Sequence, residues 1–384
     1  MSFVYTEKHE EFRERSRRFV QENIVPNIDK WEKEGIDKSF FKKVGEMKIN
    51  GILVPEEKGG LGLDFSFSVI FAREIAKVCD LSTLSSIMIQ ANTVSTLLTR
   101  YGNEYIEKEF LRPIINGDLV TGIAVSEPSG GSDLVSSTKC FAEEKEDCWI
   151  LNGEKMYITN SPIADVLIVF CRTLKGKTPL SMTFFAVPTD YEGVQIEDIK
   201  KLGQNASQIG KITFTNCKVP KENMIGKKNH GYLYLSEVFH EERLVVSAAS
   251  TTMARRCIEM TTEYVKSKHY AEDKVLFDHQ VIRYDLAYMD AEISACECFI
   301  DDIVKDIIKT GKVDKVKVCM AKYAVIEKAQ KVVRRCADFY GKNGLYLGNG
   351  IERLMRDIVV LNVYAGTAET MRELAAKSIK KIYG

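Results

Sequence analysis

The sequence predicts an α+β protein in which helices and strands occupy separate parts of the chain. Apolar residues recur at helical spacing in residues 1–118, short alternating runs rich in Thr, Val and Ile occupy 119–228, and helical spacing returns over 229–384. Because strands do not alternate with helices, this order disfavours a Rossmann fold and a TIM barrel. We therefore expect three domains with these bounds: an N-terminal helical domain, a central β-domain and a C-terminal helical domain.

The N-terminal stretch is predicted to be helical on both sides of a turn. Phe12, Phe19 and Val20 lie on one face of an early helix, and the apolar residues between 40 and 47 repeat that spacing. Residues 55–62 contain too much glycine for a helix, so we expect a turn there, and Asn116-Gly-Asp118 closes the stretch.

The central stretch is predicted to be made of strands and the last stretch of long helices. The Asn152-Gly153 pair is a typical hairpin signal, so we expect a turn there between two short strands. The clearest strand patterns are 166–170, 182–187 and 211–214. The helical patterns that follow run over about 229–268, 276–310, 313–340 and 367–382.

Composition excludes several classes of partner. The 384 residues carry 54 Lys+Arg and 54 Asp+Glu, and a formal net charge of zero argues against nucleic acid or an anionic membrane surface as a main partner. No run of about 18 apolar residues occurs and the N-terminus lacks a signal-peptide pattern, so we expect a cytoplasmic protein without a membrane span. The ten cysteines are scattered without zinc-site spacing, which favours reduced thiols and no metal centre.

Several motifs occur in a fixed order along the chain. Val125-Ser-Glu-Pro-Ser-Gly-Gly-Ser-Asp133 is followed by Leu151-Asn-Gly-Glu-Lys-Met-Tyr-Ile-Thr-Asn160 and then by Val219-Pro-Lys-Glu-Asn-Met-Ile-Gly226. Near the C-terminus come Ile351-Glu-Arg-Leu-Met-Arg-Asp357 and Val363-Tyr-Ala-Gly-Thr367. Together they resemble the acyl-CoA dehydrogenase family of flavoproteins over the whole chain. The resemblance implies a helical N-terminal domain, a central β-domain and a C-terminal four-helix bundle.

The resemblance also implies FAD as the cofactor, bound between the β-domain and the bundle. Ser126 would contact the pyrimidine side of the flavin ring, Thr159 would lie at its N5 atom, and Tyr157 would replace a tryptophan that packs on the ring. Ser132 would lie near the pyrophosphate. The implied cofactor-binding residues are Val125, Ser126, Ser132, Tyr157, Thr159, Gln280, Gly341, Lys342 and Thr367.

A catalytic base is required because the family removes an α-proton next to a thioester, which is a weak acid. The usual base is the glutamate of a Y-E-G-T segment, and this position is Ala365 here. In isovaleryl-CoA and long-chain acyl-CoA dehydrogenases the base instead precedes an arginine on a C-terminal helix, and Glu242-Arg243 match that pattern. The resemblance therefore implies Glu242 as base, Arg243 as a residue that orients the base or neutralises charge, and the Ala365 backbone N–H as a donor to the substrate carbonyl. Glu241, about 100° away on a helix, is expected to face solvent.

The half of the site that would hold the adenosine of FAD departs from the family pattern. His269, Glu272 and Asp273 stand where the family has Arg, Phe and Gly, and Asp338 and Lys342 replace Gln and Gly. Acidic groups near a pyrophosphate are electrostatically unfavourable. FAD is thus held by altered contacts in a homo-oligomer, by a different partner subunit, or not at all.

These observations leave alternatives open. The first is a dehydrogenase of an acyl thioester carried by CoA, passing electrons to an electron-transfer flavoprotein or another acceptor, in a homo-oligomer (dimer or tetramer). The second acts on an acyl or aminoacyl (for example prolyl) group tethered to a carrier protein, because Asn160-Ser-Pro-Ile-Ala-Asp165 resembles such family members. The third is a non-catalytic partner subunit of a hetero-oligomer.

Overall fold

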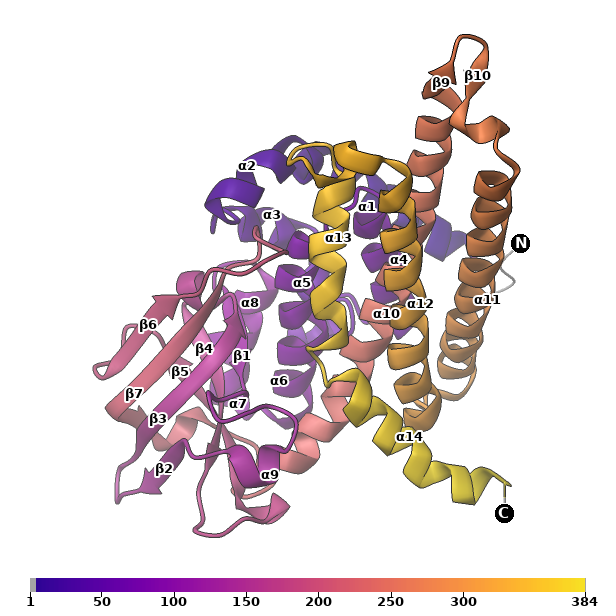
Figure 1. Ribbon diagram of the computed structural model, residues 1–384. Coiled ribbons are helices and arrows are strands. Elements are labelled where there is room, and N and C mark those ends of the chain that lie inside the picture. The colour runs from indigo at the N-terminus through magenta and orange to yellow at the C-terminus, as the bar shows by residue number, and fades with distance from the viewer. Residues whose placement is uncertain (1–4, 384) are drawn as a thin grey trace.

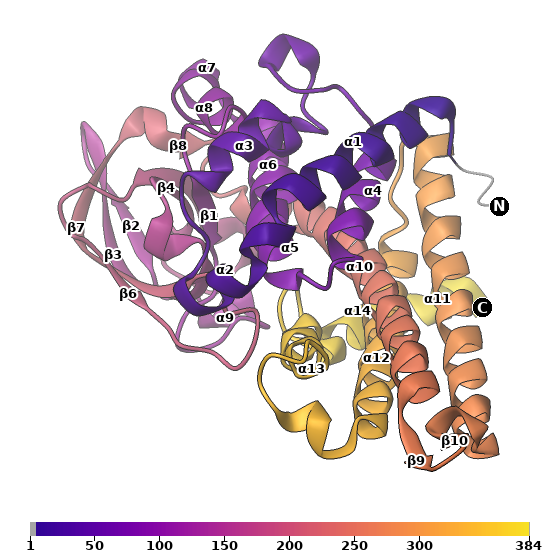
Figure 2. The same ribbon diagram turned by 90° about the horizontal axis from the view of Figure 1, so that it is seen from above.

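A β-sheet and a bundle of long helices lie on opposite sides of the molecule, with the N-terminal helices between them (Figures 1 and 2). The computed structural model describes residues 5–383, with side chains described as far as residue 379. The order of helices, strands and helices along the chain confirms the predicted α+β class.

The N-terminal helices form where apolar residues recur at helical spacing, and α1 packs against α4. Asp64 caps α4 by accepting a hydrogen bond from the Ser66 amide. The glycine-rich segment before α4 is a turn, as predicted, with a single 3-10 turn at Glu56–Lys58. The elements are α1 (Glu7–Asn23), α2 (Ile28–Glu34), α3 (Phe40–Glu46), α4 (Phe65–Ala76), α5 (Leu81–Met88), the π-helix η4 (Ile89–Val94), α6 (Ser95–Tyr101), α7 (Glu104–Ile106) and α8 (Arg112–Ile115).

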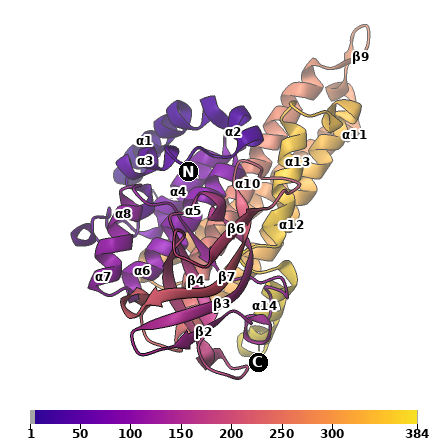
Figure 3. The ribbon, with the colours of Figure 1, turned by 90° about the vertical axis from the view of Figure 1, so that its left-hand side faces the viewer.

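The central strands form one sheet, seen in Figure 3, in the order β6-β7-β3-β2-β4-β5-β8, and β1 pairs with β4 in parallel. The three strand patterns predicted most clearly lie in β4, β5 and β7. The strands are β1 (Thr121–Ala124), β2 (Phe141–Glu144), β3 (Cys148–Thr159), β4 (Val166–Arg172), β5 (Met182–Pro188), β6 (Val194–Asp198), β7 (Ile209–Pro220) and β8 (Met224–Ile225), with the short helix α9 (Leu134–Ser137) after β1.

The predicted hairpin turn at Asn152-Gly153 is wrong, because β3 passes through it without turning. Gly153 has a φ of +137°, and the pairing of β3 with β7 shifts register between Leu151 and Gly153. A Cβ atom at Gly153 would approach Cys140 Cα within 2.6 Å. The pair therefore makes a β-bulge, and long-range pairing with β7 overrides the local turn preference.

The C-terminal helices form a bundle around α10, the longest helix of the chain at 37 residues. α11 and α12 pack on α10, and α14 packs on α12. Asp314 caps α12 by accepting hydrogen bonds from the amides of Val316 and Lys317. The elements are α10 (Gly231–Ser267), α11 (Gln280–Thr310), α12 (Lys315–Phe339), α13 (Ile351–Val359) and α14 (Ala368–Tyr383), with the hairpin of β9 (His269–Ala271) and β10 (Lys274–Val275) between α10 and α11.

The apolar cores place α10 at the junction of the three domains. One core joins the N-terminal helices to the bundle and includes Leu244 and Val245, and another fills the space between the sheet and the helices and includes Leu235 and Val238. Residues 239–243 therefore lie where α10 passes from one core to the other. Figure 1 shows the same crossing, with α10 running from beside the sheet into the bundle.

Candidate active site

Four consecutive polar side chains on α10 are buried at this junction, His240, Glu241, Glu242 and Arg243, each less than 10 % exposed. Charged side chains are rarely buried unless they are paired or hydrogen-bonded. A buried charged run in the middle of a helix is therefore the strongest indication of a functional site in the described part of the chain.

Glu242 lies against the π-helix η4 and the helix α12. Its Oε2 atom accepts a hydrogen bond of 3.2 Å from Thr93 Oγ1. Burial raises the pKa of Glu242, while the Thr93 hydroxyl and the nearby charges of Arg243 and Lys322 oppose that shift. A carboxyl group whose pKa is raised towards neutrality by a dry site is suited to general acid–base chemistry.

Arg243 is bound to the turn that follows α13 rather than to Glu242. Its Nε donates to the Ala365 carbonyl at 2.8 Å, and its Nη1 donates to His240 Nδ1 at 3.3 Å. Because arginine only donates, Nδ1 of His240 accepts, and burial together with Arg243 lowers the pKa of His240 to about 3. Ala365 has a φ of +55°, and among the described residues nothing accepts a hydrogen bond from its amide.

The expectation that Glu241 faces solvent is wrong. Glu241 is 7 % exposed, and its Oε1 accepts a hydrogen bond of 2.5 Å from Arg100 Nη2, while its Oε2 accepts one of 3.3 Å from Thr96 Oγ1. α10 crosses the centre of the molecule, so α6 covers the face that a surface helix would expose to water. Glu241 thus joins α10 to the N-terminal domain.

The helical stretch from α5 to α6 connects Glu242 to the β-domain. Gln90 Oε1 accepts from the Thr121 amide at 3.0 Å, and Asn160 Nδ2 donates to the Ser86 carbonyl at 2.9 Å. Three residues after Gln90, Thr93 reaches Glu242. Asp165, which closes the 160–165 segment, is likewise bound within the chain, accepting from the Val120 amide at 2.9 Å and from Lys38 Nζ at 2.6 Å.

A buried ion pair holds the loop 125–133 in place. Lys155 Nζ donates to Glu127 Oε1 at 2.9 Å and to the Val125 carbonyl at 3.0 Å, and both side chains are nearly inaccessible to solvent. Glu127 also accepts from the amides of Lys139 and Cys140. The Ser126 carbonyl accepts from the Met156 amide at 2.9 Å, which places the loop against β3.

Ser126, Tyr157 and Thr159 therefore lie together at one end of β3. Tyr157 has a φ of +62°, lies at a second register shift of β3 against β7, and is 60 % exposed. The bulge turns its ring outward beside the loop. An exposed aromatic ring next to hydroxyls and a glycine-containing loop suits a planar polar ring such as that of a flavin. Ser132 is exposed at the outer end of the loop.

The other implied cofactor residues do not join this group. Thr367 caps α14, with Thr367 Oγ1 accepting from the Thr370 amide at 3.2 Å. Gln280 is exposed at the start of α11, where its side-chain amide is bound to the hydroxyl of Tyr284. Gly341 and Lys342 are exposed beyond the end of α12. His269 follows the end of α10 at Ser267, which lies 25 residues beyond Glu242, or about 38 Å of helix at 1.5 Å per residue.

Sequence reasoning missed Thr93 and Lys322, and it did not assign a role to Lys155. A sequence signal for Lys322 exists. Lys322 occupies a position on the apolar face of α12, in phase with Val318 and Val325, and it is fully buried. A lysine in an apolar register is costly unless it is hydrogen-bonded, so it marks an internal polar site. Thr93 carries no such signal.

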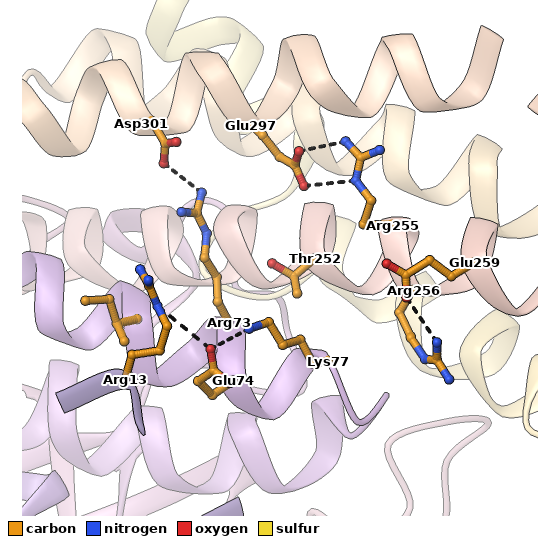
Figure 4. A pocket seen from close by; sticks show the side chains of 11 residues that line it. Arg13, Arg73, Glu74, Lys77, Thr252, Arg255, Arg256, Glu259, Glu297 and Asp301 are labelled. Carbon is orange, nitrogen blue, oxygen red and sulfur yellow. Dashed lines mark hydrogen bonds and ion pairs between the residues drawn. The ribbon is translucent and has the colours of Figure 1, made fainter. Parts of the chain in front are cut away.

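A separate charged cavity of about 540 Å³ lies between the N-terminal helices and the bundle (Figure 4). Its charges are paired within the chain: Arg73 with Asp301 at 2.9 Å, Arg255 with Glu297 at 2.7 Å and Lys77 with Glu74 at 2.5 Å. Ion pairs join the N-terminal helices α1 and α4 to each other and to the bundle helices around the cavity.

Among residues 5–383, no group of three or more His, Cys, Asp or Glu side chains could hold a metal ion. Over the same residues no helix combines the length and hydropathy needed to cross a membrane. All ten cysteines are free thiols, and eight of them are buried.

Comparisons with known proteins identify the family and the fold. Models of the acyl-CoA dehydrogenase N-terminal, middle and C-terminal domains match residues 6–118, 122–217 and 229–380. The chain is 29 % identical to long-chain specific acyl-CoA dehydrogenase of Sus scrofa (98 % of this chain, 87 % of the relative) and 29 % identical to isovaleryl-CoA dehydrogenase of Oryza sativa (99 % and 93 %). The structure matches an acyl-CoA dehydrogenase from Geobacillus kaustophilus with a TM-score of 0.94 at 33 % identity, over 99 % of this chain and 100 % of that one. The chain therefore belongs to the acyl-CoA dehydrogenase family, whose members carry out the FAD-dependent α,β-dehydrogenation of acyl thioesters.

Proposed function

We propose that Glu242 is the base that removes the α-proton of an acyl thioester. The observation that carries the proposal is a carboxylate buried at the junction of the three domains, hydrogen-bonded to Thr93 and with a raised pKa. The α-proton passes to a Glu242 oxygen while the β-hydrogen leaves with its electron pair, and the two carbons form a double bond. FAD, when bound, supplies the acceptor for that hydrogen and electron pair.

The Ala365 amide is the proposed donor to the thioester carbonyl. Removal of the α-proton places negative charge on the carbonyl oxygen, and a fixed N–H in a dry site stabilises that charge. Arg243 binds the Ala365 carbonyl, which belongs to the following peptide group, so it fixes the chain on one side of Ala365, and the left-handed backbone of that residue sets the direction of the amide on the other side. Alanine suits the position because the role uses only backbone atoms.

The proposal predicts that Glu242→Gln retains flavin but loses its reduction by substrate. Glutamine keeps the size and the hydrogen bond to Thr93 but does not accept a proton. The measurement is anaerobic bleaching of the flavin band by acyl thioesters in stopped flow, where we expect a rate loss of at least about a thousandfold. Glu241→Gln, the neighbouring buried carboxyl, is the matched control and stays within a few-fold of the wild type. Fast bleaching in Glu242→Gln overturns the assignment.

The thioester carrier is tested in the same assay. We propose CoA as the carrier, because Asn160 and Asp165 of the segment that suggested a carrier protein are bound within the chain. Acyl-CoA and acyl-loaded carrier protein of the same acyl group are compared at equal concentration. Faster reduction by the loaded carrier protein contradicts the CoA assignment while leaving Glu242 as the base.

We further propose that the protein functions as a homo-oligomer, a dimer or tetramer, located in the cytoplasm, in which each flavin contacts two subunits. The supporting observation is the separation of the two sets of implied cofactor residues. Ser126 and Thr159 lie in the β-domain, which is joined to Glu242 through η4, whereas Gln280 and Lys342 lie beyond the far ends of α10 and α12. Tyr284 and Tyr288 are more than 60 % exposed on α11, so an apolar face is available for a second copy.

Light scattering together with the flavin-to-protein ratio tests the assembly. We expect a homo-oligomer with about one FAD per chain, and Gln280→Ala is expected to weaken FAD retention without changing the secondary structure. A monomer that holds stoichiometric FAD contradicts the shared site. A protein that stays colourless with added FAD instead supports the alternative of a non-catalytic subunit. In such a subunit the buried Glu242 has no role.

We propose that electrons leave the reduced flavin to an electron-transfer flavoprotein. Reoxidation of the reduced enzyme by that acceptor tests this step.

A further inference from the structure

Lys322 is a fully buried lysine that lies beside the proposed base and has no role in the steps described so far. It projects from α12, and its Nζ donates to the Leu361 carbonyl at 2.5 Å and to the Gly366 carbonyl at 3.0 Å. These two carbonyls lie at the two ends of the segment 361–366, which we call the carbonyl turn. One side chain therefore connects both ends of the turn that carries the Ala365 amide.

The carbonyl turn depends on side chains from other elements for its shape. Ala365 and Gly366 both have positive φ, a conformation that an alanine adopts only at a cost. Besides the Lys322 bonds, Arg243 of α10 binds the Ala365 carbonyl, and Tyr364 of the turn is 3.3 Å from Ser85 Oγ of α5. Among the described residues, Lys322 is the only side chain that donates a hydrogen bond to the carbonyls of Leu361 and Gly366. Its loss leaves both ends of the turn without a side-chain donor.

The charge of Lys322 also acts on the base. The charged groups that face Lys322 are Glu242 and Arg243 of α10 and Glu369 of α14. Burial lowers the pKa of Lys322 to about 7, against the opposing influence of Glu242. Below that pH the ammonium group favours the ionised form of Glu242, which is the form that accepts a proton.

We propose that Lys322 is a positioning residue that holds the Ala365 amide in register with Glu242. The inference rests on the proposed function of Glu242 and Ala365. Because the amide and the base must act on adjacent atoms of one substrate, a displacement of the turn by about 1 Å is enough to lower the rate about a hundredfold. The hydrogen bonds of the lysine go to the turn and not to Glu242, so its effect on the base passes through the turn and through its charge.

The test compares Lys322→Met with the wild type and with Lys331→Met, an exposed lysine of the same helix. In the flavin-loaded enzyme, Lys322→Met is expected to lower the limiting rate of flavin bleaching by at least about tenfold at pH 7 while the apparent Kd of the thioester changes less than about threefold. The acidic limb of the rate–pH profile moves to higher pH, because Glu242 loses a neighbouring cation. Lys322→Arg restores the position of that limb and part of the rate.

A second readout does not depend on turnover. Amide hydrogen exchange in residues 361–367 is expected to rise at least about tenfold in Lys322→Met and to stay unchanged in Lys331→Met, with or without FAD. If Lys322→Met does not fold, Lys322→Gln, which keeps one donor, is measured in its place with the same expected directions.

The outcomes separate this inference from the function on which it rests. If no acyl thioester bleaches the wild-type flavin, the proposed function fails, whatever the exchange shows. If the wild type is bleached and Lys322→Met matches it in limiting rate, pH profile and exchange, the inference about Lys322 fails while Glu242 stands. A loss of thermal stability alone, with an unchanged rate and pH profile, also overturns it, because that is the result of a purely structural lysine.

Discussion

The four buried polar side chains on α10 have four different environments. Glu241 is bound to Arg100, Glu242 to Thr93, and Arg243 to both His240 and the Ala365 carbonyl. A buried carboxyl is stable as an anion only where hydrogen bonds and cations compensate for lost water. Glu241 has a direct ion pair, whereas Glu242 has a hydroxyl and more distant cations. Burial raises the pKa of both carboxyls, but a direct ion pair opposes the shift only at Glu241, which is why Glu242 is the carboxyl proposed as the base.

Thr93→Val tests this compensation. Valine has nearly the same shape but no hydroxyl, so the ionised form of Glu242 loses a donor and its pKa rises further. Because the base must be ionised, the rate of flavin bleaching on the acidic limb of the rate–pH profile is expected to fall about two- to tenfold and to recover as the pH rises. Thr96→Val removes the corresponding hydroxyl from Glu241 and is the control. An equal effect of both variants contradicts a specific role for Thr93.

At the scale of elements, irregular pieces of helix and strand direct side chains into the site. The π-helix η4 directs Gln90 to β1 and Thr93 to Glu242. In a regular α-helix, side chains three residues apart have a different angular spacing. β3 carries two register shifts, and the second turns Tyr157 outward beside the loop 125–133. The loop itself is fixed by Lys155 and Glu127 beneath it.

Lys155→Met is predicted to loosen the loop. It leaves Glu127 buried without its cation, and breaking a buried pair typically costs about 3–5 kcal/mol. We expect a lower Tm and faster FAD release, measured by thermal unfolding and by flavin fluorescence after dilution. The control is Lys211→Met in β7, whose ion pair with Glu154 is at the surface and contributes little. Unchanged FAD retention in Lys155→Met contradicts the link between this pair and the cofactor loop.

At the scale of the whole molecule, the β-domain is attached to the bundle through a buried acid. The Gln204 amide donates to Asp357 Oδ1, and Gln204 Nε2 donates to the Asp357 carbonyl at 3.1 Å. Burial raises the pKa of Asp357 to about 7, with the Gln204 bond opposing the shift. In the unfolded chain an aspartate titrates near 4. Between about pH 4 and 7 the folded protein therefore binds more protons than the unfolded chain, and its stability falls as the pH rises.

Asp357→Asn removes this pH dependence because asparagine stays neutral and still accepts from the Gln204 amide. Relative to the wild type, its Tm is expected to rise by about 5 °C as the pH goes from 4 to 7 and to change little above 7. Asp118→Asn, an exposed carboxyl paired with Lys42, is the control and shows no such trend. A constant Tm difference between Asp357→Asn and the wild type across this range contradicts the raised pKa.

The sequence predicts the site residues that belong to a recognisable motif, and it does not predict those whose roles arise from packing. Glu242, Arg243 and the loop 125–133 follow from motifs because their residue types and spacing are characteristic. Thr93 and Lys322 belong to no motif, since their roles arise only from the packing of η4 and α12 against α10. Glu241 was predicted to face solvent from the geometry of an isolated helix, and the packing of α6 reversed that prediction.

The sequence by itself determined the three-part order of helices and strands, the family and the candidate base, because hydrophobic periodicity and motifs are local properties of the chain. The zero net charge argued against nucleic acid and an anionic membrane surface as main partners, and the scattered cysteines argued against a zinc site, but neither observation located a site. The tertiary structure decided the contacts between distant segments. These are the β3 bulges in place of a hairpin, the burial of Glu241 and the hydrogen bonds of Lys322 to the carbonyl turn. These depend on contacts between residues that lie 39 to 145 positions apart, and such contacts are set by the shared cores that only the folded chain forms.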